Sequence, residues 1–289
     1  MAKEPRLAVL LTSFNRKLKT LAALEGLFRQ NCIEELRVQV FLVDDGSTDG
    51  TTEAVKTQFP QVRVIRGDGS LYWTGGMRVA MGEALQRGFD HYLWLNDDTI
   101  LDSDALRRLL DIEESLRSRG FGTAIVVGST RDPETGAFTY GGVVRCSRWR
   151  SLKFRAVAPS DHSQPCDTMN GNCVLIPRSV AAKVGNLSAE FTHGISDFDY
   201  GLRARRMGCT IWVAPGFYGV CARNSMARTW SDATLGLRER WTKLTSAKGL
   251  PPREWMTFAY RHAGLMWPAY AAWPYLRVVA SSLRRGKVA

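Results

Sequence analysis

The sequence predicts an α/β protein, in which a mostly parallel sheet is flanked by helices and followed by a helical C-terminal extension. Up to about residue 120, short apolar runs alternate with segments of helical apolar spacing, the pattern of a parallel sheet covered on both faces. Beyond residue 120, strand-like and hairpin-like segments indicate a mixed sheet. From about residue 231 the composition becomes aromatic and basic. We therefore expect one domain over residues 1–230 and an extension over 231–289.

The elements follow one another closely in the first half of this domain, residues 1–120. Ser47 or Thr48 is a candidate N-cap of its second helix, because hydroxyl oxygens accept hydrogen bonds from first-turn amides. The predicted strands are 6–13, 38–43, 62–65 and 92–95, and the predicted helices are 17–30, 48–59, 77–86 and 103–119. In the second half, residues 121–230, we expect strands at 123–128, 173–176 and 210–214, a hairpin or bent strand at 135–145 and a helix at 197–206.

Composition limits the classes of function. The chain has 289 residues, 45% of them hydrophobic and 23% charged, which is typical of a globular protein. No apolar run reaches the roughly 18 residues that span a bilayer, and the N-terminus lacks the apolar core of a signal peptide. The six cysteines are scattered without a C-x-x-C pair. Neither a zinc site nor a disulfide framework is expected, and the cytoplasm is the predicted location.

The net charge of +11 favours an anionic partner, which can be nucleic acid, a phospholipid surface or a phosphate-bearing substrate. A basic, non-catalytic nucleic-acid-binding protein is one alternative. No recognised nucleic-acid motif accompanies the charge, so nucleic acid is not expected as a partner.

Polar clusters follow three predicted strands, at the ends where ligands bind to parallel sheets. They are Thr12–Arg16, Asp44-Asp45 and Asn96-Asp97-Asp98. Neighbouring strands would bring these clusters together around one crevice. The adjacent carboxylates Asp97 and Asp98 repel each other, and a hard cation such as Mg²⁺ or Mn²⁺ compensates for this while sharing ligand positions with phosphates. The alternative is an acidic turn, because Asp and Asn are common turn formers.

Four motifs stand in a characteristic order and spacing: Leu10-Leu-Thr-Ser-Phe-Asn-Arg16, Val43-Asp-Asp-Gly-Ser-Thr-Asp-Gly-Thr51, Leu95-Asn-Asp-Asp-Thr99 and Ser196-Asp-Phe-Asp-Tyr-Gly-Leu-Arg203. Over roughly residues 6–225 they resemble the family 2 inverting glycosyltransferases of the GT-A fold, of the rhamnosyltransferase-like type that builds bacterial cell-surface polysaccharide and O-antigen. The resemblance implies sugar transfer from a UDP- or dTDP-sugar to a hydroxyl of a glycan or lipid-linked glycan. A sugar-phosphate nucleotidyltransferase shares the architecture, but its Gly-rich, basic signature after the first strand is not seen here.

The resemblance also implies a donor site, formed by the strand-end clusters and a Gly-rich loop at residues 67–76. Thr12, Phe14 and Asp45 match the nucleobase pocket, where an aromatic ring stacks on a pyrimidine and a carboxylate accepts its N–H. Glycines in the loop allow the backbone to approach the diphosphate and sugar closely. The implied donor-binding residues are Thr12, Phe14, Asn15, Arg16, Asp45, Gly69, Trp73, Gly76, Asn96 and Asp97.

Asp98 matches the metal-ligand position of the family's D-x-D motif, with Asn96 in place of the first acid and Asp97 in support. The implied cofactor is Mg²⁺ or Mn²⁺, which would neutralise the diphosphate leaving group. Many relatives supply a further His ligand after the last strand of the sheet. Residues 219–223 contain no His, so water, or Arg223 acting on the diphosphate, are the alternatives.

Asp197 matches the family's acidic motif and is the implied catalytic base, which takes the proton of the attacking sugar hydroxyl. A structural interpretation competes, because Ser196 as N-cap and Asp199 three residues on resemble a capping arrangement. Asp199 also stands four residues before Arg203, the spacing of a helical ion pair. The acceptor-side residues that the resemblance implies are Asn170, Asn172, His193 and Asp199.

The predicted extension combines aromatic and basic side chains, as helices at a membrane interface do. We expect Pro268 and Pro274 to interrupt any long helix. The predicted partner is the anionic inner face of the cytoplasmic membrane, to which the protein attaches peripherally near a polyprenyl-linked acceptor. Alternatively, the aromatic residues pack on the main domain as core.

Overall fold

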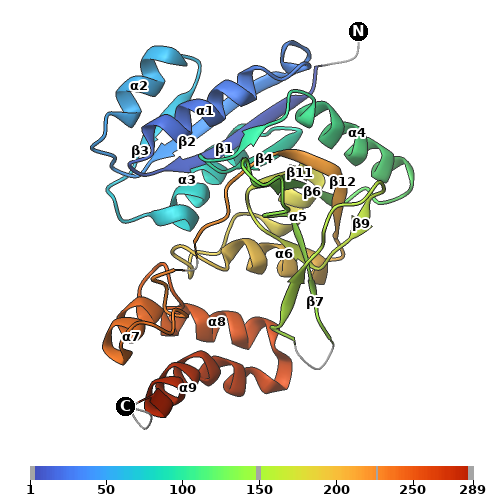
Figure 1. Ribbon diagram of the computed structural model, residues 1–289. Helices are drawn as coiled ribbons and strands as arrows, with labels where there is room; N and C mark the ends of the chain where they lie inside the picture. Colours follow the sequence, from blue (N-terminus) through green and yellow to red (C-terminus); the bar gives the residue numbers. More distant parts are fainter. Residues whose placement is uncertain (1–3, 148–150, 226, 286–289) are drawn as a thin grey trace.

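The computed structural model describes residues 4–147, 151–225 and 227–285 (Figure 1). Within them, the main sheet has nine strands, in the order β3-β2-β1-β4-β11-β6-β12-β5, with β9 paired to β12; a second sheet has the order β10-β7-β8. The strands are β1 (Arg6–Ser13), β2 (Arg37–Asp44), β3 (Arg63–Arg66), β4 (His91–Leu95), β5 (Ile100–Leu101), β6 (Ala124–Arg131), β7 (Gly142–Arg145), β8 (Phe154–Ala156), β9 (Gln164–Pro165), β10 (Thr168–Met169), β11 (Cys173–Pro177) and β12 (Thr210–Val220).

The direction of the strands explains why polar loops gather at one edge of the sheet. Strands β1 to β4 run parallel, so their carboxyl ends lie together. Strand β11 is antiparallel to β4, and its first residue, Cys173, pairs with Leu95 at the end of β4. The loop that enters β11 therefore reaches the same edge.

Helices cover both faces of the main sheet, as the alternating pattern predicts (Figure 1). One core joins the strands to α1, α2 and α4, and the other joins them to α3, α5 and α6. Alternate residues of β1 serve the two cores, with Leu7, Val9 and Leu11 on one side and Ala8 and Leu10 on the other. These helices are α1 (Lys17–Phe28), α2 (Thr51–Gln58), α3 (Tyr72–Arg87), α4 (Ala105–Ser118), α5 (Arg178–Val184) and α6 (Ser196–Arg206); short 3₁₀ helices lie at Ile33–Glu35 and Gly264–Met266.

The start of α2 differs from the prediction. Its N-cap is Gly50, in the left-handed conformation, so neither Ser47 nor Thr48 caps it. The Asp49 carboxylate instead accepts a hydrogen bond from the first-turn amide of Thr51, at 3.1 Å. The two hydroxyl residues belong to the loop between β2 and α2.

The start of α3 also differs, because the helix begins at Tyr72 rather than at Met77. The second part of the Gly-rich segment is thus helical, which the two glycines at 75 and 76 conceal in the sequence, since glycine disfavours helices. The cause is a carboxylate from the loop after β2: Asp45 accepts hydrogen bonds from the amides of Leu71 and Tyr72, at 3.2 and 2.8 Å.

The C-terminal extension forms α7 (Leu237–Thr245), α8 (Pro252–His262) and α9 (Trp267–Arg285), which lie beyond α6 and away from the main sheet (Figure 1). Phe258 of α8 packs in a third apolar cluster with Phe191 and Leu202 of the main domain. None of the helices within the described residues is both long and apolar enough to cross a membrane.

The expected interruption by proline is wrong for α9, which continues through Pro274. A proline removes the hydrogen bond to the carbonyl four residues earlier. That carbonyl, of Tyr270, instead accepts a hydrogen bond from the indole nitrogen of Trp255 on α8, at 2.9 Å. Pro268 stands in the first turn, where its missing N–H costs nothing.

Candidate active site

The three strand-end clusters meet, as the sequence predicts. Strand β1 lies between β2 and β4. Asn15, which follows β1, receives a hydrogen bond from the amide of Thr48 to its side-chain oxygen, at 2.8 Å, and its own amide donates to the Ser47 hydroxyl, at 2.8 Å. Asn15 therefore ties together the loops after β1 and β2. Its φ of 53° is left-handed, a conformation that Asn tolerates better than most residues.

Asp44 and Asp45 both hold backbone in place. Asp44 accepts the Ser47 amide and the Thr52 hydroxyl, and so orders the turn into α2. Asp45 is buried, and one of its carboxylate oxygens accepts the amides of Gly69 and Leu71. Gly69 has a φ of +90°, which only glycine adopts readily. Asp45 thus shapes the Gly-rich loop that was predicted to lie beneath the donor.

Two of the predicted donor residues pack against each other. A Cβ added to Gly76 would lie 2.1 Å from the hydroxyl oxygen of Thr12, so this glycine lets α3 lie directly on β1. Thr12 is buried by this contact. Phe14 is different, because it is 50% exposed.

Asp97 and Asp98 converge on one point. The same guanidinium nitrogen of Arg16 lies 3.1 Å from an oxygen of Asp97 and 2.9 Å from an oxygen of Asp98. Lys19 approaches Asp98 at 3.9 Å. Burial raises the pKa of Asp97 to about 6, although the charge of Arg16 opposes this shift. One oxygen of Asp97 and one oxygen of Asp98 thus contact the same cationic nitrogen, which is an arrangement that binds a cation.

This arrangement fits a divalent cation of the Mg²⁺ or Mn²⁺ type. Within the described part of the chain, no group of three or more His, Cys, Asp or Glu side chains forms a metal cage. Such cations are commonly held by one or two carboxylates and complete their shell with phosphate oxygens and water. In the segment 219–223, where a His ligand was looked for, Cys221 places its sulfur 3.5 Å from Asp98, and a thiol suits a hard cation poorly.

Asp197 lies in the first turn of α6, with its carboxylate turned to the loop that enters β11. One oxygen accepts the Gly171 amide at 3.1 Å, and the other accepts the Phe198 amide at 2.8 Å. Burial raises the pKa of Asp197 to about 6, although these amides lower it. A carboxylate with this pKa is deprotonated at neutral pH and is a stronger base than a solvated one, as general-base catalysis requires.

Trp73 connects Asp197 to the strand-end cluster Asn96-Asp97-Asp98. A Cβ on Gly171 would lie 2.5 Å from the indole ring and 3.6 Å from the Cβ of Asp197, so the three residues touch around a position that only glycine fits. The indole nitrogen donates to the side-chain oxygen of Asn96, at 2.8 Å. The amide of Asn96 donates to the carbonyl of Asn172, at 3.1 Å. The candidate base and the carboxylate pair therefore belong to one continuous site.

Ser196 does not cap α6, contrary to the alternative interpretation of the motif. The N-cap is Ile195, with a left-handed φ of 57°, and the Ser196 hydroxyl shares a hydrogen bond of 2.6 Å with the hydroxyl of Thr74 on α3. Of the four non-glycine residues with positive φ in the described chain, Asn15, Tyr72 and Ile195 all border this site. Strained backbone of this kind gathers at functional sites.

Asp199 is not on the acceptor side, which corrects its predicted place. The side chain is completely buried, and it accepts hydrogen bonds from Ser188 at 2.6 Å and from Arg203 at 2.9 Å. His262 of α8 lies 2.9 Å from its other oxygen. The expected pairing of Asp199 with Arg203 is confirmed.

The remaining acceptor-side residues have distinct surroundings. Asn170 exchanges hydrogen bonds with the backbone of Gly141, and Asn172 is buried with its amide group 3.5 Å from the sulfur of Cys221. His193 packs edge-on against Tyr72. Burial lowers the pKa of His193 to about 4, so its ring is neutral at physiological pH.

Several residues of the site were missed from the sequence. Thr74 and Thr192 act through backbone and hydroxyl contacts, which leave no charge or spacing signal. Glu254 of α8 accepts two hydrogen bonds from Thr192, and no pattern links residues so far apart. For the segment that contains Cys221, the sequence showed only that no His is present.

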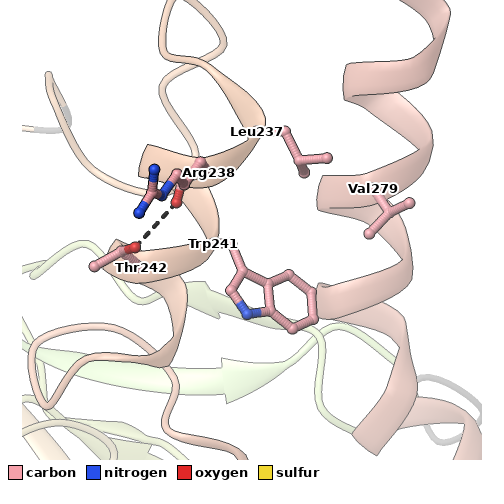
Figure 2. Close-up of a pocket in the computed structure, with 5 residues that line it drawn as sticks. All are labelled: Leu237, Arg238, Trp241, Thr242 and Val279. Atoms are coloured by element: carbon pink, nitrogen blue, oxygen red, sulfur yellow. Dashed lines mark hydrogen bonds between the residues drawn. The ribbon is translucent and has the colours of Figure 1, made fainter.

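A separate hollow lies between α7 and α9 (Figure 2). Its volume is about 660 Å³, and no carboxylate is among its lining residues, which are Leu237, Arg238, Trp241, Thr242 and Val279. It lies apart from the acidic clusters and is not the catalytic site.

Comparison with known proteins decides the class. The family Glycosyl transferase family 2 matches residues 8–175, which is more than half of the chain and includes all three strand-end clusters. The chain belongs to glycosyl transferase family 2. This glycosyltransferase is therefore an enzyme that transfers sugars rather than nucleotides, as the motifs predict. No curated protein sequence matches it.

Solved structures support the predicted GT-A fold of this glycosyltransferase. The structure titled S. aureus TarS 1-349 is similar, with a TM-score of 0.54 and 13% identity over 88% of this chain and 69% of that one. A longer S. aureus TarS structure gives a TM-score of 0.56 and 13% identity, again over 88% of this chain but 42% of the other. At this identity the likeness concerns the fold alone.

Proposed function

We propose that this glycosyltransferase moves a sugar from a UDP- or dTDP-sugar to a hydroxyl of a glycan or lipid-linked glycan, with inversion at the anomeric carbon and Asp197 as catalytic base. The observation that carries the proposal is the Asp197 carboxylate, held by the Gly171 amide and joined through Trp73 and Asn96 to the Asp97-Asp98 pair. A base and a phosphate-side cation site within one crevice are what glycosyl transfer requires.

The base has a defined task. A sugar hydroxyl is a weak nucleophile at neutral pH, and Asp197 accepts its proton as the oxygen attacks the anomeric carbon. The Gly171 and Phe198 amides fix the carboxylate so that it does not have to be ordered during the reaction. His193, being neutral, binds the acceptor through hydrogen bonds rather than charge.

On the donor side, the exposed ring of Phe14 stacks on the nucleobase, and Asp45 holds the loop that lies under the diphosphate. A divalent cation, when bound, neutralises the departing diphosphate. Asp98 and Asp97 would hold it, and Arg16, which now pairs with both, is long enough to turn towards the phosphates.

Two substitutions test this assignment. Asp197→Asn removes the base, and Asp98→Ala removes the proposed cation ligand; each should reduce donor turnover by roughly a hundredfold or more. The measurement is release of nucleoside diphosphate from UDP- and dTDP-sugars with Mn²⁺ and a glycan acceptor. Asp161→Asn, at a side chain 94% exposed, is the matched control and should retain activity. Turnover near that of the wild type in both site variants would refute the proposed roles.

Metal and nucleotide can be tested without turnover. A nucleoside diphosphate should raise the melting temperature, with a larger rise when Mn²⁺ is present, since binding to the native state stabilises it. The Mn²⁺-dependent part should disappear in Asp98→Ala. Equal stabilisation with Mn²⁺ and with a chelator in the wild type would argue against a bound cation.

We further propose that the extension, residues 231–289, attaches the enzyme peripherally to the anionic inner face of the cytoplasmic membrane, where a polyprenyl-linked acceptor is located and cell-surface polysaccharide is assembled. Most large hydrophobic side chains that the described residues expose lie on α7–α9 and their connections. Leu265 is 99% exposed and Trp273 62% exposed. No Asp or Glu occurs in α9, so this helix presents no acidic side chain to anionic lipid.

Vesicle sedimentation tests the attachment. Leu265→Ser with Trp273→Ser should weaken binding to phosphatidylglycerol-containing vesicles more than tenfold, because each buried side chain contributes about 1.5–3 kcal/mol. Leu18→Ser, at a side chain 77% exposed on α1, is the matched control. Truncation is unsuitable, since α8 shares a core with the main domain. Unchanged binding of the double variant would refute this surface.

A further inference from the structure

Helix α8 contacts the loop that leads to the proposed base. Glu254, in its first turn, is buried, and its two carboxylate oxygens accept the amide of Thr192 at 3.0 Å and the hydroxyl of Thr192 at 2.6 Å. Thr192 lies four residues before the start of α6. A charged acceptor bound to both donors of one residue fixes the position of that residue firmly.

From Thr192 a short path of hydrogen bonds leads to Asp197. The carbonyl of Thr192 accepts the amide of Thr74, at 3.1 Å, and the Thr74 hydroxyl donates to the carbonyl of His193, also at 3.1 Å. The same hydroxyl shares a hydrogen bond of 2.6 Å with Ser196. Ser196 directly precedes Asp197, so the backbone of the base is fixed from both α3 and α8.

The other end of α8 is fixed equally well. Its last carbonyls, of Arg261 and His262, accept hydrogen bonds from Arg206 at 2.9 Å and from Arg145 at 3.3 Å. Cations at this end also interact favourably with the helix dipole. With Phe258 in the shared apolar cluster, α8 is held along its whole length and can act as a rigid support for the loop.

The loop needs such support, because it contains strained backbone. Ile195 has a left-handed φ of 57°, which costs roughly 1–3 kcal/mol for a non-glycine residue and persists only where surrounding contacts impose it. On one side of Ile195 the contact is the hydrogen bond between the hydroxyls of Thr74 and Ser196. On the other side it is the hydrogen bond that Thr192 donates to Glu254.

We propose that Glu254 is a positioning residue for Asp197 and that α8, although it belongs to the C-terminal extension, is part of the frame of the catalytic site. The inference rests on the proposed role of Asp197 as base. The extension then has two tasks on opposite sides of one helix, because Met256 and Tyr260 of α8 are exposed while Glu254 faces the catalytic loop.

The test compares Glu254→Ala with Glu254→Gln, which retains an acceptor for the Thr192 amide and a donor or acceptor for its hydroxyl. Glu254→Ala should lower kcat by roughly ten- to a hundredfold, as expected for a misplaced catalytic group, while KM for the donor changes little. In Glu254→Ala the acidic fall of kcat/KM should also move to lower pH, because water then reaches the carboxylate of Asp197. Glu254→Gln should keep most of the wild-type kcat and the wild-type pH at which kcat/KM falls.

Thr192→Val guards against a folding defect, since it removes only the hydroxyl bond. Thr192→Val should shift the acidic fall of kcat/KM to lower pH, by less than Glu254→Ala does. Glu239→Ala, at an exposed ion pair on α7, is the matched control and should leave both parameters unchanged.

The outcomes are distinguishable from failure of the proposed function. If the wild type is active and Asp197→Asn is not, but Glu254→Ala and Thr192→Val keep the wild-type kcat and pH profile, the positioning role is refuted and the base remains. If Asp197→Asn is fully active, the proposed base fails first, whatever the α8 variants do.

Discussion

Two sides of the same helical turn give two carboxylates opposite properties. Asp197 and Asp199 are two residues apart in the first turn of α6, where the helix dipole favours negative charge at both positions. Burial raises the pKa of Asp197 to about 6. Burial also acts against ionisation of Asp199, but hydrogen bonds from His262 and Ser188 and the charge of Arg203 outweigh it and hold the pKa well below its usual range.

The difference shows that partners, rather than position in the helix, decide what an acid does. On the side that faces the loop entering β11, Asp197, the proposed base, receives hydrogen bonds from the backbone amides of Gly171 and Phe198. On the side that faces α8, Asp199 is surrounded by cationic and hydroxyl donors, and it joins the extension to the main domain. Under the proposed function, Asp197 is the acid available for proton transfer, and Asp199 is the acid that stabilises the fold.

The largest expected effect on stability is that of Asp199→Asn. Removing one partner from a buried charge network costs about 3–5 kcal/mol, since Arg203 loses its counter-ion and Arg261 keeps only Glu190. Urea unfolding at pH 7 measures it, with Asp161→Asn as the exposed control. Because the folded-state pKa of Asp199 is depressed, this contribution is present above the unfolded value of about 4 and is lost as pH falls below it. A loss under about 1 kcal/mol would show that the network is dispensable.

The opposite result is expected for Asp197→Asn, which should be more stable than the wild type at pH 7. A pKa raised to about 6 means that the folded protein binds the proton more tightly than the unfolded chain does. The charged form therefore destabilises by up to about 3 kcal/mol above pH 6, and the penalty vanishes below about pH 4. Urea unfolding of both proteins at pH 7 and pH 4 checks the sign. Destabilisation at pH 7 would show that this carboxylate supports the fold.

The two acids also show how far the sequence could be read. The helix, its acidic motif and the pairing of Asp199 with Arg203 follow from spacing, and the parallel half of the sheet follows from the alternation of apolar patterns. The low pKa of Asp199 depends in part on His262, 63 residues away, and that contact has no local signal.

The same limit applies to the other misses. The early start of α3 depends on the carboxylate of Asp45, and the continuity of α9 through Pro274 depends on the indole of Trp255. In both places a hydrogen bond between the backbone and a distant side chain overruled local propensity, with Asp45 as acceptor and Trp255 as donor. The three strand-end clusters could be predicted to converge, because parallel strands fix their carboxyl ends without help from side chains.

The pH dependence of catalysis separates the two acids in one experiment. Because Asp197 must be deprotonated to act as base, kcat/KM should fall about tenfold per pH unit below pH 6. Asp199 stays ionised over this range, so the protein should remain folded while its activity falls. Far-ultraviolet circular dichroism recorded beside the rate at each pH checks this. If structure and activity are lost together, the limb reports unfolding and not the base.

The smallest expected effect tests the geometry of the structural side alone. Arg203→Lys keeps the positive charge beside Asp199 but loses the planar fork, which also donates to the carbonyls of Val184 and Asn186 at 3.0 and 2.9 Å. Each lost hydrogen bond costs about 0.5–1.5 kcal/mol, so a decrease of about 1–3 kcal/mol in the free energy of unfolding is expected. Arg29→Lys, in an exposed pair with Glu25, is the matched control and should change it by less than about 0.5 kcal/mol. Because neither side chain touches the face of α6 that carries Asp197, kcat should be unchanged in both variants. Equal effects of the two substitutions on the free energy of unfolding would mean that the charge of Arg203, without its planar fork, is enough to join α6 to α5.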